Sequence, residues 1–299
     1  MDSFSGLESF VRAADQLSFA KAGRLLGISA SAVGKNVARL EQQLGVRLFN
    51  RTTRHTRLTQ EGVLFHERCR RILDELDDAR AMMQDAVAAP RGRLRVSLPT
   101  IGYRFLLPVV PEFMQRYPDV ELELDFNDRI VDVIAGGFDA AIRSGDLADS
   151  QLTARRLGPF RFVLCATPAY FAQHGVPRVP ADLARHACIR FRFPTTGKLH
   201  DWQFRDQPAN FVASFPTVLT CNNMEALRGA TVLGLGIGYM PDFLVRDDLA
   251  AGTLRTVLDA HLKHEGQFSV LWPSSRQLSP KLRVFVDFLA ERLFGGREG

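Results

Sequence analysis

Two consecutive helical patterns near the amino terminus, joined by a short glycine-containing turn, constrain the fold of this chain most. Apolar residues recur at helical spacing from Phe4 to Leu17, and Ser18 can cap a second helix. Gly27 ends this second helix, and Ser29 can cap a third helix shortly afterwards. Two helices joined by so short a turn form a helix-turn-helix. The sequence therefore predicts this motif within residues 18–44.

The third helix has one apolar stripe and one polar face. The stripe falls at intervals of four, three and four residues and is expected to be buried: Val33, Val37, Leu40 and Leu44. The opposite face carries small or polar side chains: Ser31, Lys35, Ala38 and Gln42, with Arg39 on the flank. Small residues let a helix enter a major groove, where Lys35 can reach guanine or a phosphate and Asn36, if turned outward, can reach adenine. An ordinary solvated helix face is the alternative interpretation.

The segment that follows the third helix combines β-branched alternation with positive charge. Residues 48–59 carry three arginines and a histidine among threonines: Arg51, Arg54, Arg57 and His55. This pattern predicts a two-stranded wing, whose arginines can enter a minor groove or pair with phosphates while threonine hydroxyls donate to phosphate oxygens. A purely solvated hairpin is the alternative.

The excess positive charge of the chain is concentrated in this region. Residues 1–60 hold nine basic and four acidic residues, a surplus of five that equals the formal net charge of +5 for all 299 residues. A basic head on a neutral body attracts a polyanion such as DNA. The amino terminus has no export signal, and no apolar stretch approaches the ~20 residues of a spanning helix. We therefore expect a cytoplasmic protein with no membrane segment.

The stretch LSFAKAGRLLGISASAVGKNVARLEQQLGVRLFNRTTRHTRLTQEG resembles the winged helix-turn-helix of LysR-type transcriptional regulators, a resemblance that covers residues 4–62. It implies that bases are read from the start of the recognition helix, at Ala30, Ser31, Gly34 and Lys35. It also implies wing contacts at Arg51, Thr52, Thr53 and Arg54. Gly34 stands where the family usually has serine, and Ala30 replaces a commonly polar residue. The reading of bases is therefore expected to depend more on Lys35, Ser31 and the wing than on Gly34 and Ala30.

A long helix is expected after Thr59, because no proline occurs until Pro90. Its apolar residues follow a heptad-like seam: Phe65, Cys69, Ile72, Leu76, Ala79, Met83 and Val87. We expect residues 60–89 to be a linker helix that pairs two copies of the chain, although a core helix within one domain is the alternative. Paired recognition helices require a roughly palindromic operator on double-stranded DNA. The family resemblance implies homodimers that assemble into homotetramers.

The remaining two thirds of the sequence has an α/β pattern. Pro90, Arg91 and Gly92 mark a hinge, after which strand, helix and strand over residues 93–126 predict a βαβ unit. Expected strands are 93–98, 120–126, 138–143, 161–166, 188–193, 216–221 and 267–272. Expected helices are 101–117, 129–135, 168–174, 223–233, 242–250 and 279–294.

Several blocks of this region, such as DAAIRSGDL and GLGIGYMPDFLV, resemble the effector domain of the same family. The resemblance implies an α/β chain with an N-terminal winged helix-turn-helix, a long linker helix and a two-lobed, periplasmic-binding-protein-like effector domain. We therefore expect a DNA-binding domain at 1–59, a linker helix at 60–89 and an effector domain at 90–299. Lobe I would comprise residues 92–161 and 268–299, and lobe II residues 162–267.

A small molecule between the lobes would meet residues where strands end and helices begin, because free N–H groups there attract anions. We expect Thr100 to donate its hydroxyl, Arg143 to pair with a carboxylate, Phe191 to stack and Asn222 to fix the ligand from lobe II. In the alternative, Thr100 and Asn222 are helix caps and Arg143 belongs to a structural ion pair.

The sequence lacks the motifs of an enzyme. Two His-Glu pairs lack the second histidine of a zinc motif, which is replaced by Arg70 and Phe268. Glycines 234, 236 and 238 follow a helix, so close helix-to-strand packing explains them better than a dinucleotide loop. The scattered cysteines favour reduced thiols. We expect no cofactor and no metal. The alternative to a transcriptional regulator is an architectural or non-regulatory DNA-binding protein, in which the basic head only adheres to DNA and the ligand cleft is vestigial.

Overall fold

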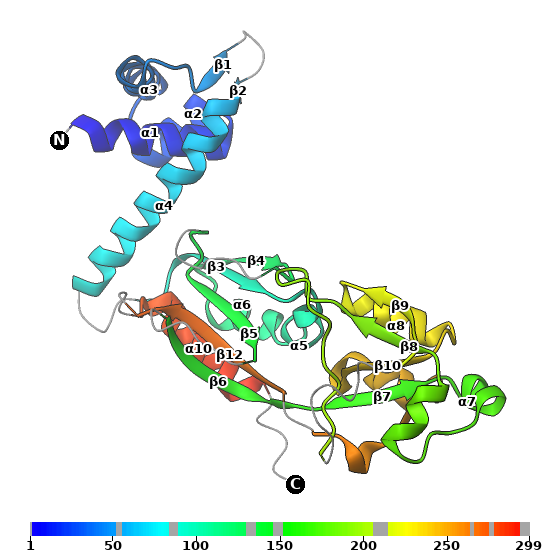
Figure 1. Ribbon diagram of the computed structural model, residues 1–299. Helices are drawn as coiled ribbons and strands as arrows, with labels where there is room; N and C mark the ends of the chain where they lie inside the picture. Colours follow the sequence, from blue (N-terminus) through cyan, green and yellow to red (C-terminus); the bar gives the residue numbers. More distant parts are fainter. Residues whose placement is uncertain are drawn as a thin grey trace. The chain divides into compact units, whose positions relative to one another are not determined.

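The computed structural model of the protein describes residues 2–51, 56–83, 89–129, 136–145, 152–205, 215–263, 266–274 and 278–293 (Figure 1). The chain divides into two compact units, residues 1–88 and 89–299. Each unit has its own hydrophobic core and is described by itself. No helix in these ranges is long and apolar enough to cross a membrane.

The first unit is a winged helix-turn-helix followed by a long helix. Its elements are α1 (Asp2–Gln16), α2 (Phe19–Leu26), α3 (Ala30–Leu44), β1 (Phe49–Arg51), β2 (Thr56–Leu58) and α4 (Gln60–Met83). The two predicted caps are confirmed, because Ser18 accepts from the Lys21 amide and Ser29 from the Ala32 amide. Gly27 ends α2 with a φ of +67°, in the left-handed region that favours glycine.

The core of the first unit forms where α1 and α3 meet the wing and the start of α4. Phe10 lies at its centre, with its ring centroid 5.5 Å from those of Phe49 and Phe65. Val33, Val37 and Leu40 are buried as predicted. Leu44, expected in the same stripe, is 41% exposed, because it lies in the last turn, beyond the reach of this core.

The apolar seam predicted on the long helix is wrong in its first half. Cys69 is buried in the core of the first unit and Phe65 packs against that core, so neither side chain is available to a partner helix. Among the side chains of α4 that the structure describes, the exposed apolar ones are Val63, Leu64 and Ile72, of which only Ile72 belongs to the predicted seam. Of the remaining seam positions, the side chains of residues 79 and 83, and the whole of residue 87, lie outside what the structure describes.

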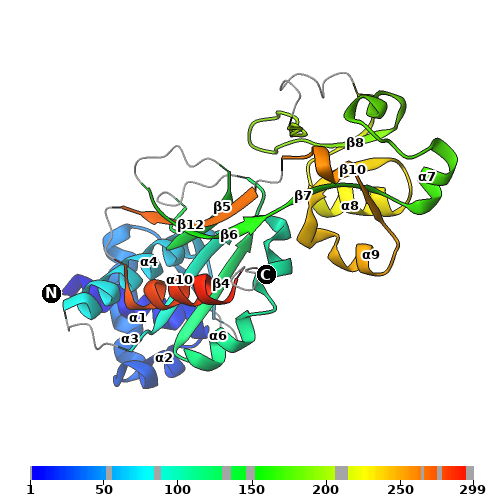
Figure 2. The same ribbon diagram turned by 90° about the horizontal axis from the view of Figure 1, so that it is seen from below.

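Lobe I of the second unit is built on a five-stranded sheet in the order β4-β3-β5-β12-β6 (Figure 2). The strands are β3 (Gly92–Leu98), β4 (Val120–Phe126), β5 (Ala140–Ser144), β6 (Leu152–Phe160) and β12 (Gly266–Pro273). β3 is parallel to β4 and β5, whereas β12 is antiparallel to β5 and β6. Helix α10 (Pro280–Arg292) packs through Phe285 and Phe288 against Phe113, with ring centroids 5.3 Å apart in both pairs.

Two predictions for lobe I need correction. The helix expected over 101–117 is broken into η1 (Thr100–Gly102), α5 (Tyr103–Leu106) and α6 (Val110–Arg116), because Pro108 cannot continue the hydrogen bonding of a helix. Strand β6 was not expected, since Gly158 and Pro159 are poor strand formers. β6 lies at the edge of the sheet, where a proline is tolerated. The helix expected over 129–135 falls largely outside the described residues.

Lobe II has a second five-stranded sheet in the order β11-β7-β10-β8-β9. Its strands are β7 (Phe162–Ala166), β8 (Cys188–Phe191), β9 (Thr217–Cys221), β10 (Ile237–Pro241) and β11 (Arg255–Val257). Its helices are α7 (Pro168–His174), η2 (Pro180–Arg185), α8 (Met224–Val232), η4 (Asp242–Leu244), α9 (Arg246–Ala250) and η5 (Asp259–His261). A Cβ at Gly238 would lie 2.4 Å from Oγ1 of Thr231, so this glycine lets β10 pack closely against α8.

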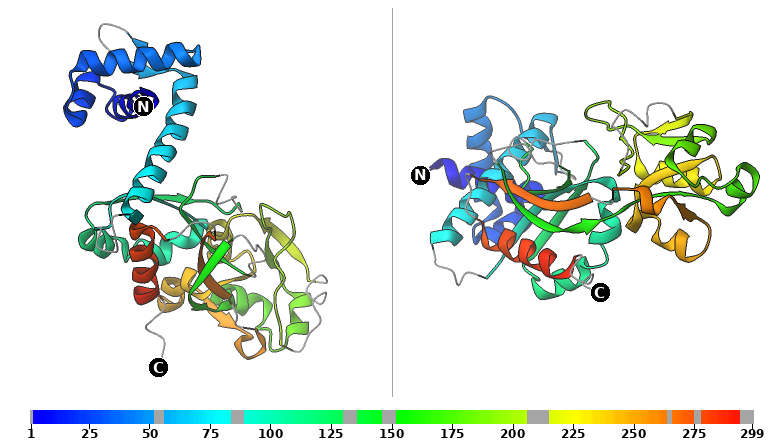
Figure 3. Two further views of the ribbon diagram at one scale, coloured as in Figure 1. Left: turned by 90° about the vertical axis from the view of Figure 1, so that its left-hand side faces the viewer. Right: turned by 60° about the horizontal axis from the view of Figure 1, so that its bottom comes forward.

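The chain passes between the lobes twice, and both crossings lie side by side. The first crossing leads from β6 of lobe I, which ends at Phe160, to β7 of lobe II, which begins at Phe162. The second crossing leads back from lobe II into lobe I through β12 (Figure 3). Gly266 and Gln267, which precede the expected boundary at 268, already pair with β6 in the sheet of lobe I. The rings of Phe160 and Phe268 stack at 4.7 Å, next to an irregularity in register between Phe268 and Ser269.

Candidate functional site

The recognition helix α3 exposes most of the residues that were expected to read DNA. Ala30, Ser31 and Lys35 are exposed, and Gly34 is half-buried. A Cβ at Gly34 would have no heavy atom within 4 Å, so this glycine leaves open space on the helix surface. α3 thus presents a surface of small side chains followed by a cation.

Asn36 does not belong to this reading surface. Its Nδ2 donates to Oγ of Ser9 on α1 at 2.9 Å, so the side chain fixes α3 against α1 rather than turning outward. With its side chain in this position, Asn36 does not make the contact to adenine that the sequence suggested. Lys35 is left as the long polar side chain on the exposed face near the start of α3.

The wing is attached to the recognition helix by a carboxylate. Oε1 of Glu41 accepts from the amides of Leu48 and Phe49 at 2.8 and 3.0 Å, which holds the start of β1 against α3. β1 and β2 pair antiparallel from Phe49 opposite Leu58 to Arg51 opposite Thr56. The wing residues Thr52, Thr53 and Arg54 lie outside the described residues, as does the side chain of Arg51.

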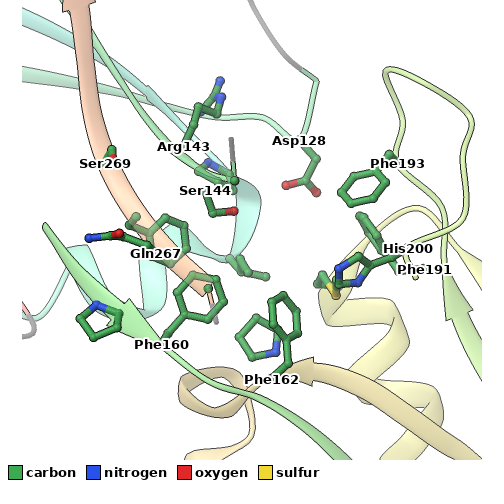
Figure 4. A pocket seen from close by; sticks show the side chains of 18 of the residues that line it. Asp128, Arg143, Ser144, Phe160, Phe162, Phe191, Phe193, His200, Gln267 and Ser269 are labelled. Carbon is green, nitrogen blue, oxygen red and sulfur yellow. The ribbon is translucent and has the colours of Figure 1, made fainter. Parts of the chain in front are cut away.

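The second unit contains a cavity of about 850 Å³ between its two lobes. Polar side chains come from lobe I: Asp128, Arg143, Ser144, Arg156 and Ser269. Aromatic side chains come from the crossing strands and lobe II: Phe160, Phe162, Phe191, Phe193, His200, Tyr239 and Phe268. Figure 4 shows Asp128, Arg143 and Ser144 on one side of the cavity and the rings of Phe160, Phe162 and His200 on the other. The cavity therefore has a polar end and an aromatic end.

Arg143 lies at the polar end of the cavity, where a carboxylate partner was expected. Its guanidinium donates to the carbonyl of Ile142 at 2.8 Å and to Oγ of Ser97 at 2.7 Å. Burial lowers the pKa of Arg143 from its usual value, and the negative charges of Asp125 and Asp128 oppose this shift. Both of these hydrogen bonds go to neutral acceptors, and the nearby carboxylates act on the guanidinium through their charge.

The structure brings together two of the four residues predicted to bind an effector. Arg143 and Phe191 line the cavity, whereas Thr100 and Asn222 are not among its lining residues. The amide of Thr100 donates to Oδ1 of Asp128 at 2.8 Å, and Asp128 does line the cavity. The cap of α8 is Asn223, which accepts from the Ala226 amide, and not Asn222.

Sequence reasoning missed most of the aromatic end. Phe160 and Phe162 alternate along the crossing strands, and Phe191 and Phe193 alternate from the last residue of β8 onward. Such paired aromatics at the ends of strands were the available signal. Nothing in the sequence pointed to His200 as a cavity residue, because it belongs to no periodic pattern and lies outside the helices and strands.

His200 is enclosed by aromatic rings in lobe II. Its ring centroid is 4.9 Å from that of Phe162, 5.3 Å from that of Phe193 and 5.5 Å from that of Tyr239. Burial, assisted by the charge of Arg190, lowers the pKa of His200 to about 4. The imidazole is therefore neutral near pH 7.

A network of charged side chains links the two lobes outside the cavity. Arg104 of α5 donates from Nε and Nη2 to the two carboxylate oxygens of Glu225 on α8, at 3.0 and 3.2 Å. The hydroxyl of Tyr103 donates to the same carboxylate at 2.8 Å. Burial raises the pKa of Glu225, but the hydrogen bonds from Arg104 and Tyr103 outweigh it, so the pKa lies below its usual value. These contacts hold α5 of lobe I against α8 of lobe II.

A helix-turn-helix head and a two-lobed body with a cavity between its lobes define a DNA-binding regulator of transcription with a ligand-binding domain. Residues 4–63 match the family description "Bacterial regulatory helix-turn-helix protein, lysR family", and residues 88–294 match "LysR substrate binding domain". The chain belongs to the LysR-type family of transcriptional regulators.

Individual relatives resemble the chain over nearly its full length. It is 35% identical over 293 residues to the uncharacterised HTH-type transcriptional regulator YhjC of Escherichia coli, with 97% of each chain covered. It is 37% identical over 290 residues to the HTH-type transcriptional regulator CrgA of Neisseria meningitidis, with 96% of each covered. The solved structure of CrgA matches with a TM-score of 0.61, covering 96% of this chain and 97% of that one. These relatives are regulators, and the chain is a regulator rather than an enzyme.

Proposed function

We propose that this regulator binds a roughly palindromic operator and that a small anionic molecule, such as a carboxylate, modulates this binding from the cavity between the lobes. The observation that carries the anionic part is the pair of arginines, Arg143 and Arg156, on the lobe I wall of the cavity. Lobe II supplies aromatic surface opposite them, including Phe191. Thr100 and Asn222 remain predictions as further effector contacts.

The DNA-binding part of the proposal rests on the first unit. Ala30, Ser31, Gly34 and Lys35 would face the bases, while Arg51, Thr52, Thr53 and Arg54 of the wing would contact the backbone and the minor groove. We propose a DNA-binding domain at 1–59, a linker helix at 60–89 and an effector domain at 90–299. Action on chromosomal DNA implies a cytoplasmic protein.

Self-association is part of the same proposal. The exposed apolar side chains of α4, Val63, Leu64 and Ile72, offer surface for pairing two linker helices. A homodimer would hold two recognition helices at the spacing of a two-fold operator, and homodimers would assemble into a homotetramer. A ligand that touches both lobes would favour one arrangement of these subunits and shift the balance between DNA-bound states.

The DNA-binding proposal is tested by competition between an operator fragment and random duplex at fixed salt. A regulator should prefer the operator by at least ~10³-fold, whereas an architectural protein would show little preference. Lys35→Ala should weaken operator binding more than random binding. Arg54→Ala should weaken binding to the operator and to random duplex alike. It should also reduce, by about one unit, the slope of the logarithm of the binding constant against the logarithm of the salt concentration. Lys263→Ala, an exposed lysine of lobe II, is the matched control.

The effector part is tested by calorimetric titration of the full chain with small carboxylates. Binding that falls at least about tenfold in Arg143→Gln would support the anion site, because a charge-assisted hydrogen bond contributes about 1.5–3 kcal/mol. Arg178→Gln, an exposed arginine of lobe II, is the control. Equal affinity in both variants would contradict the role of Arg143.

A further inference from the structure

The aromatic end of the cavity contains a polar atom that the protein leaves without a partner. Nδ1 of His200 is buried and accepts or donates no hydrogen bond among the described residues. A buried polar atom without a partner destabilises the fold, and such atoms in native structures call for an explanation. The imidazole lines the cavity, so a molecule bound there would be the nearest source of a partner.

The position of His200 is fixed by its backbone. Its amide donates to the carbonyl of Phe191 at 2.8 Å, and its carbonyl accepts from Nη2 of Arg190 at 3.0 Å. The guanidinium of Arg190 is itself buried and lies 5.5 Å from the ring centroid of Trp202. These contacts place the imidazole at the cavity wall without using its ring nitrogens.

The surroundings of the ring suit another aromatic group. Phe162, Phe191 and Phe193 lie around His200, and the rings of Phe162 and Tyr239 stack at 4.9 Å. Aromatic side chains favour planar rings in offset or edge-on contact. A phenylalanine at position 200 would fill such a wall equally well, so packing alone does not require an imidazole.

The two ends of the cavity differ in charge. At the polar end the two cations Arg143 and Arg156 outnumber the carboxylate of Asp128, whereas the aromatic end holds a neutral imidazole, because burial keeps the pKa of His200 near 4. A neutral imidazole offers one donor and one acceptor nitrogen. An anionic group therefore suits the polar end, and a neutral hydroxyl or N–H group suits the imidazole.

We propose that His200 is the hydrogen-bonding residue of an aromatic subsite, which takes a planar ring bearing a hydroxyl or N–H group on an effector whose acidic end lies toward Arg143. The proposal rests on the anionic effector inferred above and adds the chemistry of its other end. Ligand pockets of ~300–1,000 Å³ hold molecules of this kind, and the cavity of about 850 Å³ has room for one.

The test uses four carboxylates as probes: acetate, cyclohexanecarboxylate, benzoate and 4-hydroxybenzoate. Titration calorimetry on the full chain should give the tightest binding for 4-hydroxybenzoate, with benzoate ahead of the saturated ring. In His200→Phe the advantage of 4-hydroxybenzoate over benzoate should fall at least fivefold, while benzoate itself changes less than threefold. His174→Phe makes the same replacement at an exposed histidine of lobe II and should change nothing.

A second measurement needs no variant. The imidazole ¹⁵N resonances of His200 in the wild-type chain should shift on adding 4-hydroxybenzoate and shift less on adding benzoate. Unchanged resonances at saturating 4-hydroxybenzoate would overturn the proposal even if His200→Phe proved unstable.

The outcomes separate this subsite from the anion site. Failure of all four probes to bind would overturn both the anionic effector and the aromatic subsite. Binding that requires Arg143 but treats cyclohexanecarboxylate and benzoate alike would overturn the subsite only. A hydroxyl preference that persists in His200→Phe would also overturn the assignment to His200.

Discussion

Acidification should weaken the effector-binding unit through His200. Burial lowers the pKa of this residue from 6.5 to about 4. Between these values the unfolded chain binds a proton that the folded chain excludes, so acid favours unfolding. The stability that comes from the neutral ring is complete above pH 6.5 and is lost as the pH falls toward 4.

The size of the effect follows from the two pKa values. The shift of about 2.5 units corresponds to a limit of about 3.4 kcal/mol at 1.36 kcal/mol per unit. Between pH 7 and pH 5 the linkage relation gives a loss of about 2 kcal/mol from this one residue. Such a loss is a large part of the stability of an ordinary domain.

Urea unfolding at pH 7 and pH 5, followed by tryptophan fluorescence, would measure this loss. Both tryptophans of the chain, Trp202 and Trp272, lie in the second unit, so the signal reports that unit. The difference in unfolding free energy between wild type and His200→Phe should change by about 2 kcal/mol between the two pH values. His174→Phe is the control. Parallel pH dependence in wild type and His200→Phe would refute the reasoning.

Three further substitutions test the packing described above. Gly34→Ala should raise the unfolding free energy of the first unit by about 1 kcal/mol, because its Cβ meets nothing within 4 Å; thermal unfolding that shows a loss would contradict this. Gly62→Ala should cost at least about 2 kcal/mol in the same assay, since its Cβ would lie 2.0 Å from the carbonyl oxygen of Leu48. Glu225→Gln should lower the unfolding free energy of the second unit by about 1–3 kcal/mol, because it weakens the contact with Arg104. The control Glu291→Gln, in an exposed ion pair, should lower it by less than about 0.5 kcal/mol. Equal losses in the two variants would argue against the link between the lobes.

The sequence predicted the elements whose signals are local. Ser18, Gly27 and Ser29 mark helix ends through contacts within a few residues, and these ends are confirmed. β6, β10 and β11 were missed because their identity depends on partners distant in the sequence. β6 forms against β12, more than a hundred residues away, despite Gly158 and Pro159.

The site was predictable only in part for a related reason. Arg143 could be placed because it ends a buried strand, and strand ends meet at one edge of a sheet. His200 lies in no regular element, and its ring reaches the cavity because Arg190 and Phe191 bind its backbone. The seam on α4 was misjudged because heptad spacing does not tell whether Phe65 and Cys69 face a partner or their own domain.

The two crossing strands also form part of the cavity wall. Phe160, Phe268 and Ser269 line the cavity, and the same residues lie where the chain passes from one lobe to the other. Under the proposed function, a molecule seated between the lobes would therefore contact the residues at the crossings directly. A change in the angle between the lobes on binding would then begin at these three side chains, without a relay through the rest of the domain.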